Sequence, residues 1–396
     1  MSPNFHIPYI LPTSLLAIAL VFKFPTLVRA WRDPDVRATT ILLACATAVL
    51  VVITPINIHR LNVWTGVPNI AAPWAYSFLT AFCATGLTMI MRWREPPSER
   101  RRRRMIAIYW IYAGIIVALW GTFLLADVPE PRIYDLDTYY ASTLWMREHT
   151  LLYLIAHMVS SLIAAYMLWK WFPEVTHRWL KAGVIFLQVG YASGLVFDIT
   201  KLIAVAARWT GSDLDWLSTK AAPPFALLEA VLVALGFIVP QAGPFLQKWG
   251  RDQAEYVRLR ALWRTVKVVG PAAATARIGL LGPVDLRLMQ REQRIHDALR
   301  LLAPYFNPAA HQAAYTAAQA DHDGPTARGI AGAIAIQDAT AAYEKKAIHD
   351  TSDQPPQIGP DVTEHLNAIA RALYRPRTLD RIRGQVTSTE SATTHA

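Results

Sequence analysis

Long apolar runs separated by short polar loops dominate the first 245 residues of the chain. Seven runs are long enough to cross a bilayer, because a spanning helix needs about 20 mostly apolar residues. These runs cover approximately residues 7–25, 39–57, 72–92, 105–126, 149–171, 182–205 and 222–243. The pattern predicts an all-α, seven-helix transmembrane bundle over residues 1–245. A soluble protein with buried helices is the alternative, and seven successive runs disfavour it.

The pattern becomes amphipathic after residue 245. Residues 246–268 carry apolar side chains at helical spacing among several arginines and lysines. Further helices are predicted over 284–303, 308–321, 325–348, 361–374 and 378–384. We therefore expect a helical domain over 246–384. The segment 350–360 and the polar tail 385–396 have compositions typical of disorder.

Composition agrees with a membrane protein. Only 17% of residues are charged, against about 25% in soluble proteins, and 14 Trp and 15 Tyr suit the bilayer interfaces. Cys45 and Cys83 fall inside apolar runs and predict buried thiols rather than a disulfide framework. The first ten residues contain no Lys or Arg, so we expect the first run to be a retained helix, not a signal peptide.

Basic residues in the loops predict the orientation. The loops after the first, third and fifth runs carry more Arg and Lys than the alternate loops, which places the N-terminus outside and the C-terminal domain in the cytoplasm. One loop holds five consecutive arginines, namely Arg100, Arg101, Arg102, Arg103 and Arg104. We expect this run to fix topology and to contact anionic lipid, and we do not expect it to bind nucleic acid.

Ionisable residues inside the runs indicate a site, because a charge within a bilayer is costly. The candidate lining residues, all expected in the outer half, are Asp198, Lys201, Glu229, His157, Asn57, Tyr76 and Thr80. They predict a polar cavity open to the outside. Two acids against one base favour a protonatable site or a cationic ligand from outside. The alternative is structural, with Asp198 and Lys201 neutralising one another and Glu229 and His157 satisfied in the core.

No catalytic or cofactor motif is recognisable. The C-terminal domain lacks a phosphate-binding Gly-rich loop, HExxH, CxxC and GxSxG. The run Asp321-His322-Asp323 is more typical of a solvated turn than of a metal site. We therefore predict no enzyme activity, no cofactor and no metal.

Two elements of the C-terminal domain resemble a known family. The first is the segment 259–263, LRALW, which contains Trp263. The second is the stretch 288–305, whose matching residues include Arg291, Ile295, Asp297, Leu299, Pro304 and Tyr305. They resemble an uncharacterised actinobacterial family of multi-pass membrane proteins, usually labelled as transporters, with a C-terminal domain of unknown function. Glu292, Arg294 and His296 depart from its pattern. The resemblance implies a bacterial plasma membrane and no established activity.

Three functions remain open from the sequence. A sensor would relay an external ligand or ion signal to the cytoplasmic domain and a regulatory partner protein. A small-molecule or ion transporter would need polar groups through the inner half and is often built from internal repeats, and we find no repeat. A membrane-embedded enzyme is the third reading. The one-sided polar groups favour the sensor.

Overall fold

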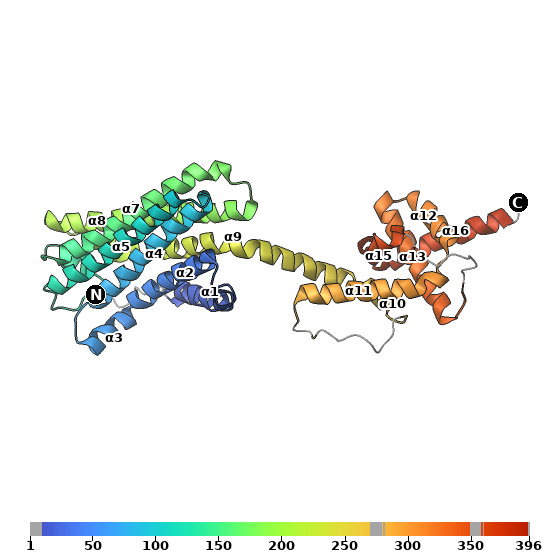
Figure 1. The fold of residues 1–396 in the computed structure, drawn as a ribbon, viewed down its shortest axis with the longest axis horizontal. Helices are drawn as coiled ribbons and strands as arrows, with labels where there is room; N and C mark the ends of the chain where they lie inside the picture. The colour runs from blue at the N-terminus through green and yellow to red at the C-terminus, as the bar shows by residue number, and fades with distance from the viewer. Residues whose placement is uncertain (1–9, 270–278, 280–281, 349–357, 359, 395–396) are drawn as a thin grey trace. The chain divides into compact units, whose positions relative to one another are not determined.

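The computed structural model describes residues 10–269, 279, 282–348, 358 and 360–394, and every regular element in them is helical. The chain separates into two compact units, Met1–Pro244 and Phe245–Ala396 (Figure 1). Seven of the described helices are long and apolar enough to cross a membrane. They are α1 (Ile10–Arg29), α2 (Pro34–Ile53), α4 (Ala71–Arg94), α5 (Glu99–Leu125), α7 (Met146–Trp171), α8 (Arg178–Trp209) and α9 (Ala222–Arg258). The predicted fold class, seven apolar helices followed by a further helical region, is confirmed.

Local capping sets where several of these helices begin. Asp33 precedes α2, its Oδ1 accepts the N–H of Asp35 at 2.8 Å, and Pro34 occupies the first helical position. Ser98 caps α5 by accepting the N–H of Arg101 at 3.1 Å. The arginine run therefore forms the first turns of α5, whereas the hydrophobic pattern placed the start of this helix near residue 105.

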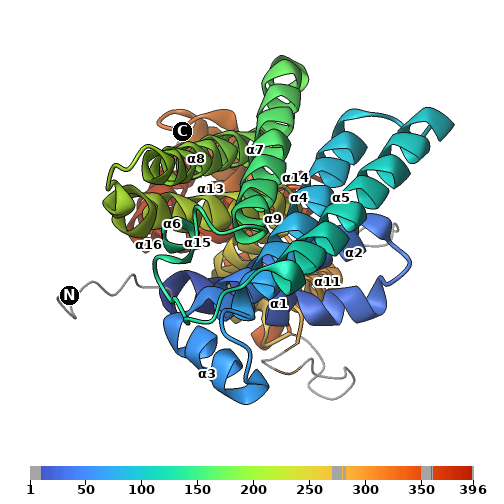
Figure 2. The same cartoon turned by 90° about the vertical axis from the view of Figure 1, so that its left-hand side faces the viewer.

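Helix α4 lies at the centre of the bundle. It packs against α2, α5 and α7, and 67% of its most apolar stretch is buried, against 17% for α5. Figure 2 looks along the bundle and shows α5 at the periphery. Much of the core consists of fully buried apolar side chains from α2, α4, α8 and α9, including Leu42, Leu43, Met89, Ile90, Leu187 and Phe237.

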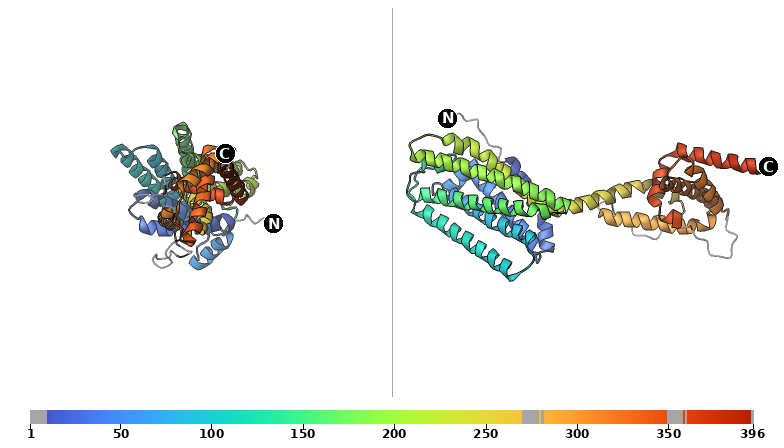
Figure 3. Two further views of the ribbon diagram at one scale, coloured as in Figure 1. Left: turned by 90° about the vertical axis from the view of Figure 1, so that its right-hand side faces the viewer. Right: turned by 90° about the horizontal axis from the view of Figure 1, so that it is seen from above.

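Helices α8 and α9 approach closely because glycine lies where they meet. A Cβ atom at Gly190 would lie 2.8 Å from a methyl carbon of Val233, and one at Gly236 would lie 2.5 Å from Leu187. Small residues allow such contact between membrane helices. The two helices run side by side in the views of Figures 2 and 3.

Short elements join the spans at one end of the bundle, which we call the acidic-loop end. They are α3 (Pro55–Thr65), the loop 126–135, α6 (Leu136–Tyr139) and the π-helical turn η2 (Leu217–Ala221). Asn69, in the left-handed conformation with φ +62°, is hydrogen-bonded to the loop 126–135. Its amide donates to the carbonyl of Glu130 at 2.9 Å and accepts the N–H of Arg132 at 2.7 Å. The opposite, arginine-rich end carries the loops 30–33 and 95–98 and the segment 172–177, which contains η1 (Phe172–Glu174).

The second unit is a helical domain built around α13 (Gly324–Glu344). Helix α13 packs against most of the other helices of this unit, and its Ile330, Ile334 and Ile336 are buried. The remaining elements are α10 (Arg260–Val266), α11 (Val284–Leu302), η3 (Ala303–Tyr305), α12 (Pro308–Gln319), α14 (Pro360–Thr363), α15 (Leu366–Leu373) and α16 (Pro376–Thr394).

The C-terminal tail differs from the expectation of disorder over 385–396. Helix α16 continues to Thr394, since no Pro or Gly follows Gly384 to end it. The last two residues lie outside the described ranges, as does most of the segment 350–360.

Candidate functional site

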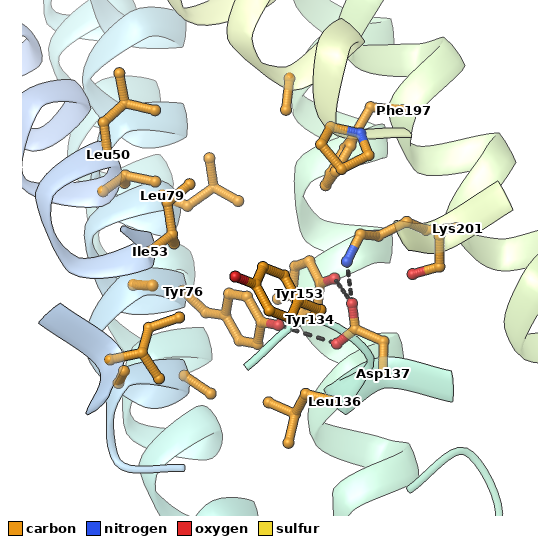
Figure 4. Close-up of a pocket in the computed structure, with 18 of the residues that line it drawn as sticks. Leu50, Ile53, Tyr76, Leu79, Tyr134, Leu136, Asp137, Tyr153, Phe197 and Lys201 are labelled. Atoms are coloured by element: carbon orange, nitrogen blue, oxygen red, sulfur yellow. Dashed lines mark hydrogen bonds and ion pairs between the residues drawn. The ribbon is translucent and has the colours of Figure 1, made fainter. Parts of the chain in front are cut away.

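A cavity of about 210 Å³ lies at the acidic-loop end of the bundle. Side chains of α2, α4, α7, α8, η2 and α9 line it, together with residues of the segment 132–137. Figure 4 shows Leu50, Ile53 and Leu79 on one wall, with Lys201 and Asp137 across from them. The cavity is therefore apolar on one side and polar on the other.

Asp137 is the centre of the polar wall. It lies on the short helix α6 and is 3% exposed. The hydroxyl of Tyr76 donates to Oδ1 at 3.0 Å, the hydroxyl of Tyr153 donates to Oδ2 at 2.8 Å, and Lys201 forms an ion pair with Oδ2 (Figure 4). Three donors from three spanning helices thus converge on one carboxylate.

These contacts hold Asp137 in its charged form. Burial by itself would raise the pKa of its carboxyl, but the ammonium of Lys201 and the hydroxyls of Tyr153 and Tyr76 outweigh it, so the pKa lies below the usual 3.8. The rings of Tyr76 and Tyr153 stack with centroids 3.6 Å apart and an interplanar angle of 17°. The stacking fixes both hydroxyls on the carboxylate.

A second buried cluster centres on His157 of α7. Its Nδ1 lies 2.9 Å from both carboxylate oxygens of Asp198 on α8, and its Nε2 lies 3.4 Å from Oε1 of Glu229 on α9. All three side chains are nearly inaccessible to solvent. Because both ring nitrogens face carboxylates, the geometry favours a doubly protonated imidazole.

Glu229 has an unmet hydrogen-bonding capacity. The 3.4 Å contact with His157 lacks hydrogen-bond geometry, and within the described residues its Oε1 has no hydrogen-bond partner. The carboxyl lies over Gly194 of α8, where an added Cβ would come within 2.4 Å of it. Ser218 of η2 also lines the cavity, and its buried hydroxyl has no partner among those residues either. Such groups are costly unless a water or ligand satisfies them.

The structure brings four predicted residues to the cavity and leaves three outside its lining. Lys201, His157, Glu229 and Tyr76 line it. Asp198 does not, and it lies behind His157. Thr80 donates to the carbonyl of its own helix at Tyr76, 2.7 Å away. Asn57 belongs to α3, because Pro55 follows the last residue of α2 and its cap, and it donates to the carbonyl of Val51 at 2.7 Å.

The suggested Asp198–Lys201 ion pair is wrong. The two residues are three apart on α8, but the bundle gives each a different partner: His157 for Asp198, and Asp137 for Lys201. Hydropathy could not identify Asp137 as a site residue, because it lies in the connection between two spans. Tyr153 was also missed, although it precedes His157 by one helical turn and so shares its face.

The residues that carry the family resemblance are mainly structural. Ile295 and Leu299 are buried in the core of the second unit, and Trp263 and Tyr305 pack against it. Pro304 lies in η3. The guanidinium of Arg291 lies 3.5 Å from the ring centroid of Tyr256 and donates to its carbonyl. Asp297 accepts the amide of Gln293 at 3.2 Å, one turn away.

The arginine run is largely exposed. Arg100, Arg102, Arg103 and Arg104 are exposed and Arg101 is half-buried. Glu95 and Glu99 engage only part of it, at 3.4 Å from Arg104 and 3.8 Å from Arg102. Most of the positive charge at the start of α5 is therefore free for an external anion. In the described parts of the chain, no group of three or more His, Cys, Asp or Glu residues could hold a metal ion.

Fold and site together define a multi-pass helical membrane protein with a buried, charged cavity. Residues 248–376 match the family of unknown function DUF6545, so the second unit contains a DUF6545 domain. Comparison with curated proteins gave no match, and comparison with solved structures gave none. The family match covers the C-terminal domain and carries neither a transport function nor a source organism.

Proposed function

We propose that the protein is a membrane receptor. A small ligand enters the cavity at the acidic-loop end and changes the conformation of the bundle. This conformational change is relayed to the DUF6545 domain, which presents an altered surface to a regulatory protein. The proposal assigns binding and relay to the chain, not catalysis. The acidic-loop end faces outward and the DUF6545 domain lies in the cytoplasm of a bacterial cell, in keeping with the arginines at the opposite end.

One observation carries this proposal: the helix that lines the cavity is the helix that leads into the DUF6545 region. Glu229 lies on α9, which continues without a break to Arg258, ten residues beyond the start of the family match at 248. At 37 residues, α9 is about 55 Å long, far more than the roughly 30 Å of a bilayer core. Movement of Glu229 can therefore pass along a single element.

Two prolines give α9 a place to bend. Pro240 and Pro244 lie inside the helix, and each removes a backbone hydrogen bond and favours a kink. Both follow Glu229 along the chain and precede the DUF6545 match. A ligand that displaces the Glu229 carboxyl would change the packing of α9 against α8, with the prolines as the hinge.

The arginine-rich half of the bundle favours a receptor over a transporter. Its centre holds the apolar side chains Met89, Ile90, Leu187 and Phe237, all 0% exposed. A transporter needs a path through this region, and a receptor does not. The exposed arginines of α5 would contact the anionic head groups of the bilayer.

Transport is the second candidate, and one observation favours it. The polar groups are not confined to the cavity: Gln188 of α8 is partly buried with its Oε1 unpartnered among the described residues, and Lys23 donates to Gln241 near the arginine-rich end. Polar and ionisable groups at several depths of the membrane are a feature of proton-coupled carriers. Alternating access would then expose the cavity to both sides.

Side-specific cysteine labelling separates the two functions. Thr219→Cys places a thiol at a half-buried position of the cavity lining, and Gly250→Cys places one in open space on the second unit, in a background with Cys45→Ala and Cys83→Ala. A membrane-impermeant maleimide should label Thr219→Cys in whole cells only, and Gly250→Cys in inside-out vesicles only. Labelling of Thr219→Cys from both sides would overturn the receptor in favour of a transporter. Labelling of Gly250→Cys in whole cells would overturn the orientation.

A further inference from the structure

The cavity has a buried carboxylate oxygen, Oε1 of Glu229, that His157 Nε2 approaches at 3.4 Å without forming a hydrogen bond. The Glu229 side chain is 6% exposed and lines the cavity, and its Oε1 has no hydrogen-bond donor in the described part of the chain. A charged carboxylate in this position needs a donor, because burial without one costs a large part of its hydration energy. The missing group is a hydrogen-bond donor.

The charges around the cavity are also unbalanced. Lys201 is paired with Asp137, and Arg132, which lines the cavity, is engaged by Glu130 at 2.7 Å and Asp135 at 3.5 Å. Within the described residues, the carboxyl groups of Asp198 and Glu229 share His157 as their ion-pair partner. When both carboxyl groups are ionised, even a doubly protonated His157 leaves this cluster with one negative charge. A donor that carries a positive charge would balance it.

The apolar part of the lining disfavours a bare or hydrated metal ion as the occupant. Leu50, Ile53, Leu79 and Phe197 line the space (Figure 4), and they offer no oxygen ligand to a hard cation. The rings of Tyr76 and Tyr153 complete an apolar and aromatic surface, which suits an organic ammonium group and a hydrocarbon body. About 210 Å³ is a small space and limits the ligand to a few carbon atoms or a single ring.

We propose that the cavity binds a small protonated amine with an apolar body, whose N–H donates to Glu229 while the body packs on Leu50, Ile53 and Leu79. The amine is the ligand of the proposed receptor, so the inference rests on that function. A quaternary ammonium carries the charge but has no N–H for the Glu229 oxygen, and it should bind more weakly. The hydroxyl of Ser218, which has no partner within the described residues, would bond a second polar group on the ligand.

Binding is tested with full-length protein in lipid nanodiscs. The probes are 2-phenylethylammonium, its N,N,N-trimethyl derivative, the neutral 2-phenylethanol and the anionic 3-phenylpropanoate, each titrated to about 10 mM at constant ionic strength, with tryptophan fluorescence and the thermal midpoint as readouts. We expect saturable binding and a raised midpoint for the primary amine alone. Glu229→Gln should weaken it at least tenfold, because a charged hydrogen bond is lost.

Glu174→Gln is the matched control, since Glu174 is exposed in η1 at the other end of the bundle, and it should bind as wild type does. If Glu229→Gln fails to fold, Gly194→Ala serves instead, because its methyl group would displace the same carboxyl. Binding of 2-phenylethanol or 3-phenylpropanoate as strong as that of the primary amine would overturn the assignment of an amine ligand. Unchanged amine binding by Glu229→Gln would also overturn it, as would an equal rise of the thermal midpoint in NaCl. None of these results alters the one-sided labelling of Thr219→Cys, so the ligand class and the receptor fail separately.

Discussion

Removing the carboxylate of Asp137 should be among the most destabilising conservative changes in the bundle. Asp137 is 3% exposed and Lys201 is 15% exposed, and the two form an ion pair. Breaking a buried pair by removing one partner costs about 3–5 kcal/mol, since the other charge is left buried and unpaired. Asp137→Asn also replaces an oxygen by an NH2 group that faces the hydroxyls of Tyr76 or Tyr153, which are both donors.

A double-mutant cycle isolates the pair. We expect Asp137→Asn and Lys201→Met each to lower the free energy of unfolding by about 3 kcal/mol, and the double variant to recover about 2 kcal/mol of the summed loss. The assay is equilibrium unfolding by SDS in dodecylmaltoside micelles, followed by tryptophan fluorescence. Asp198→Asn with Lys201→Met is the control cycle. Its coupling should be clearly smaller than that of the Asp137–Lys201 cycle, because Asp198 contacts His157 and Lys201 forms its ion pair with Asp137.

Either of two results would refute this reasoning. An Asp137→Asn variant that loses less than about 1 kcal/mol would mean that the carboxylate is not buried in a paired state. A larger coupling in the Asp198–Lys201 cycle than in the Asp137–Lys201 cycle would restore the pairing suggested by spacing alone.

Three further predictions concern pH and packing. The pKa of Asp137 is lowered when folded, so its stabilisation is present above its usual 3.8 and is lost as the pH falls through the lowered value; Asp137→Asn should remove this acid limb from a pH series of unfolding midpoints. Burial and the nearby Glu255 raise the pKa of Glu292, so the folded state loses stability as the pH rises through this raised pKa and the carboxyl ionises. Glu292→Gln removes the ionisation and should raise the unfolding midpoint measured at pH 7. Gly329→Ala would place a Cβ 2.7 Å from a backbone oxygen of Ala368 and should cost about 1–3 kcal/mol in chemical unfolding, whereas Gly384→Ala, in open space, should be neutral or stabilising.

The spans could be predicted from the sequence because each depends on composition alone. A run of about 20 apolar residues has few alternatives to a membrane helix, and each predicted run overlaps one of the seven helices. The predicted ends of the spans were less accurate where helix capping, rather than hydropathy, determines the first or last residue. The cap at Ser98 starts α5 at Glu99, just before the arginine run. Pro55 ends α2 before Asn57, because the residue before a proline avoids the helical conformation.

The site could be predicted only in part, because depth in the membrane does not determine facing. His157, Glu229 and Lys201 were identified as costly charges inside spans, and they do line one cavity. Asp137 lies in the connection between two spans, where hydropathy gives no sign of a site residue. Tertiary structure brings Asp137 to Lys201, and the hydrogen bonds of Asn69 to the backbone of the preceding loop are part of it. A spacing of three on α8 indicated a shared face for Asp198 and Lys201, but the partner of each is set by α7 and α6.

The relay from the cavity to the DUF6545 domain is tested most directly by hydrogen exchange on two matched alanine variants. Gly194→Ala would push the Glu229 carboxyl at the cavity, and Gly114→Ala, on α5, meets no atom within 4 Å. With full-length protein in nanodiscs, we expect Gly194→Ala to change the exchange rates of amides in α10 and α11 at least threefold, and Gly114→Ala to leave them as in wild type. Unchanged exchange throughout the DUF6545 domain of a folded Gly194→Ala variant would contradict the relay.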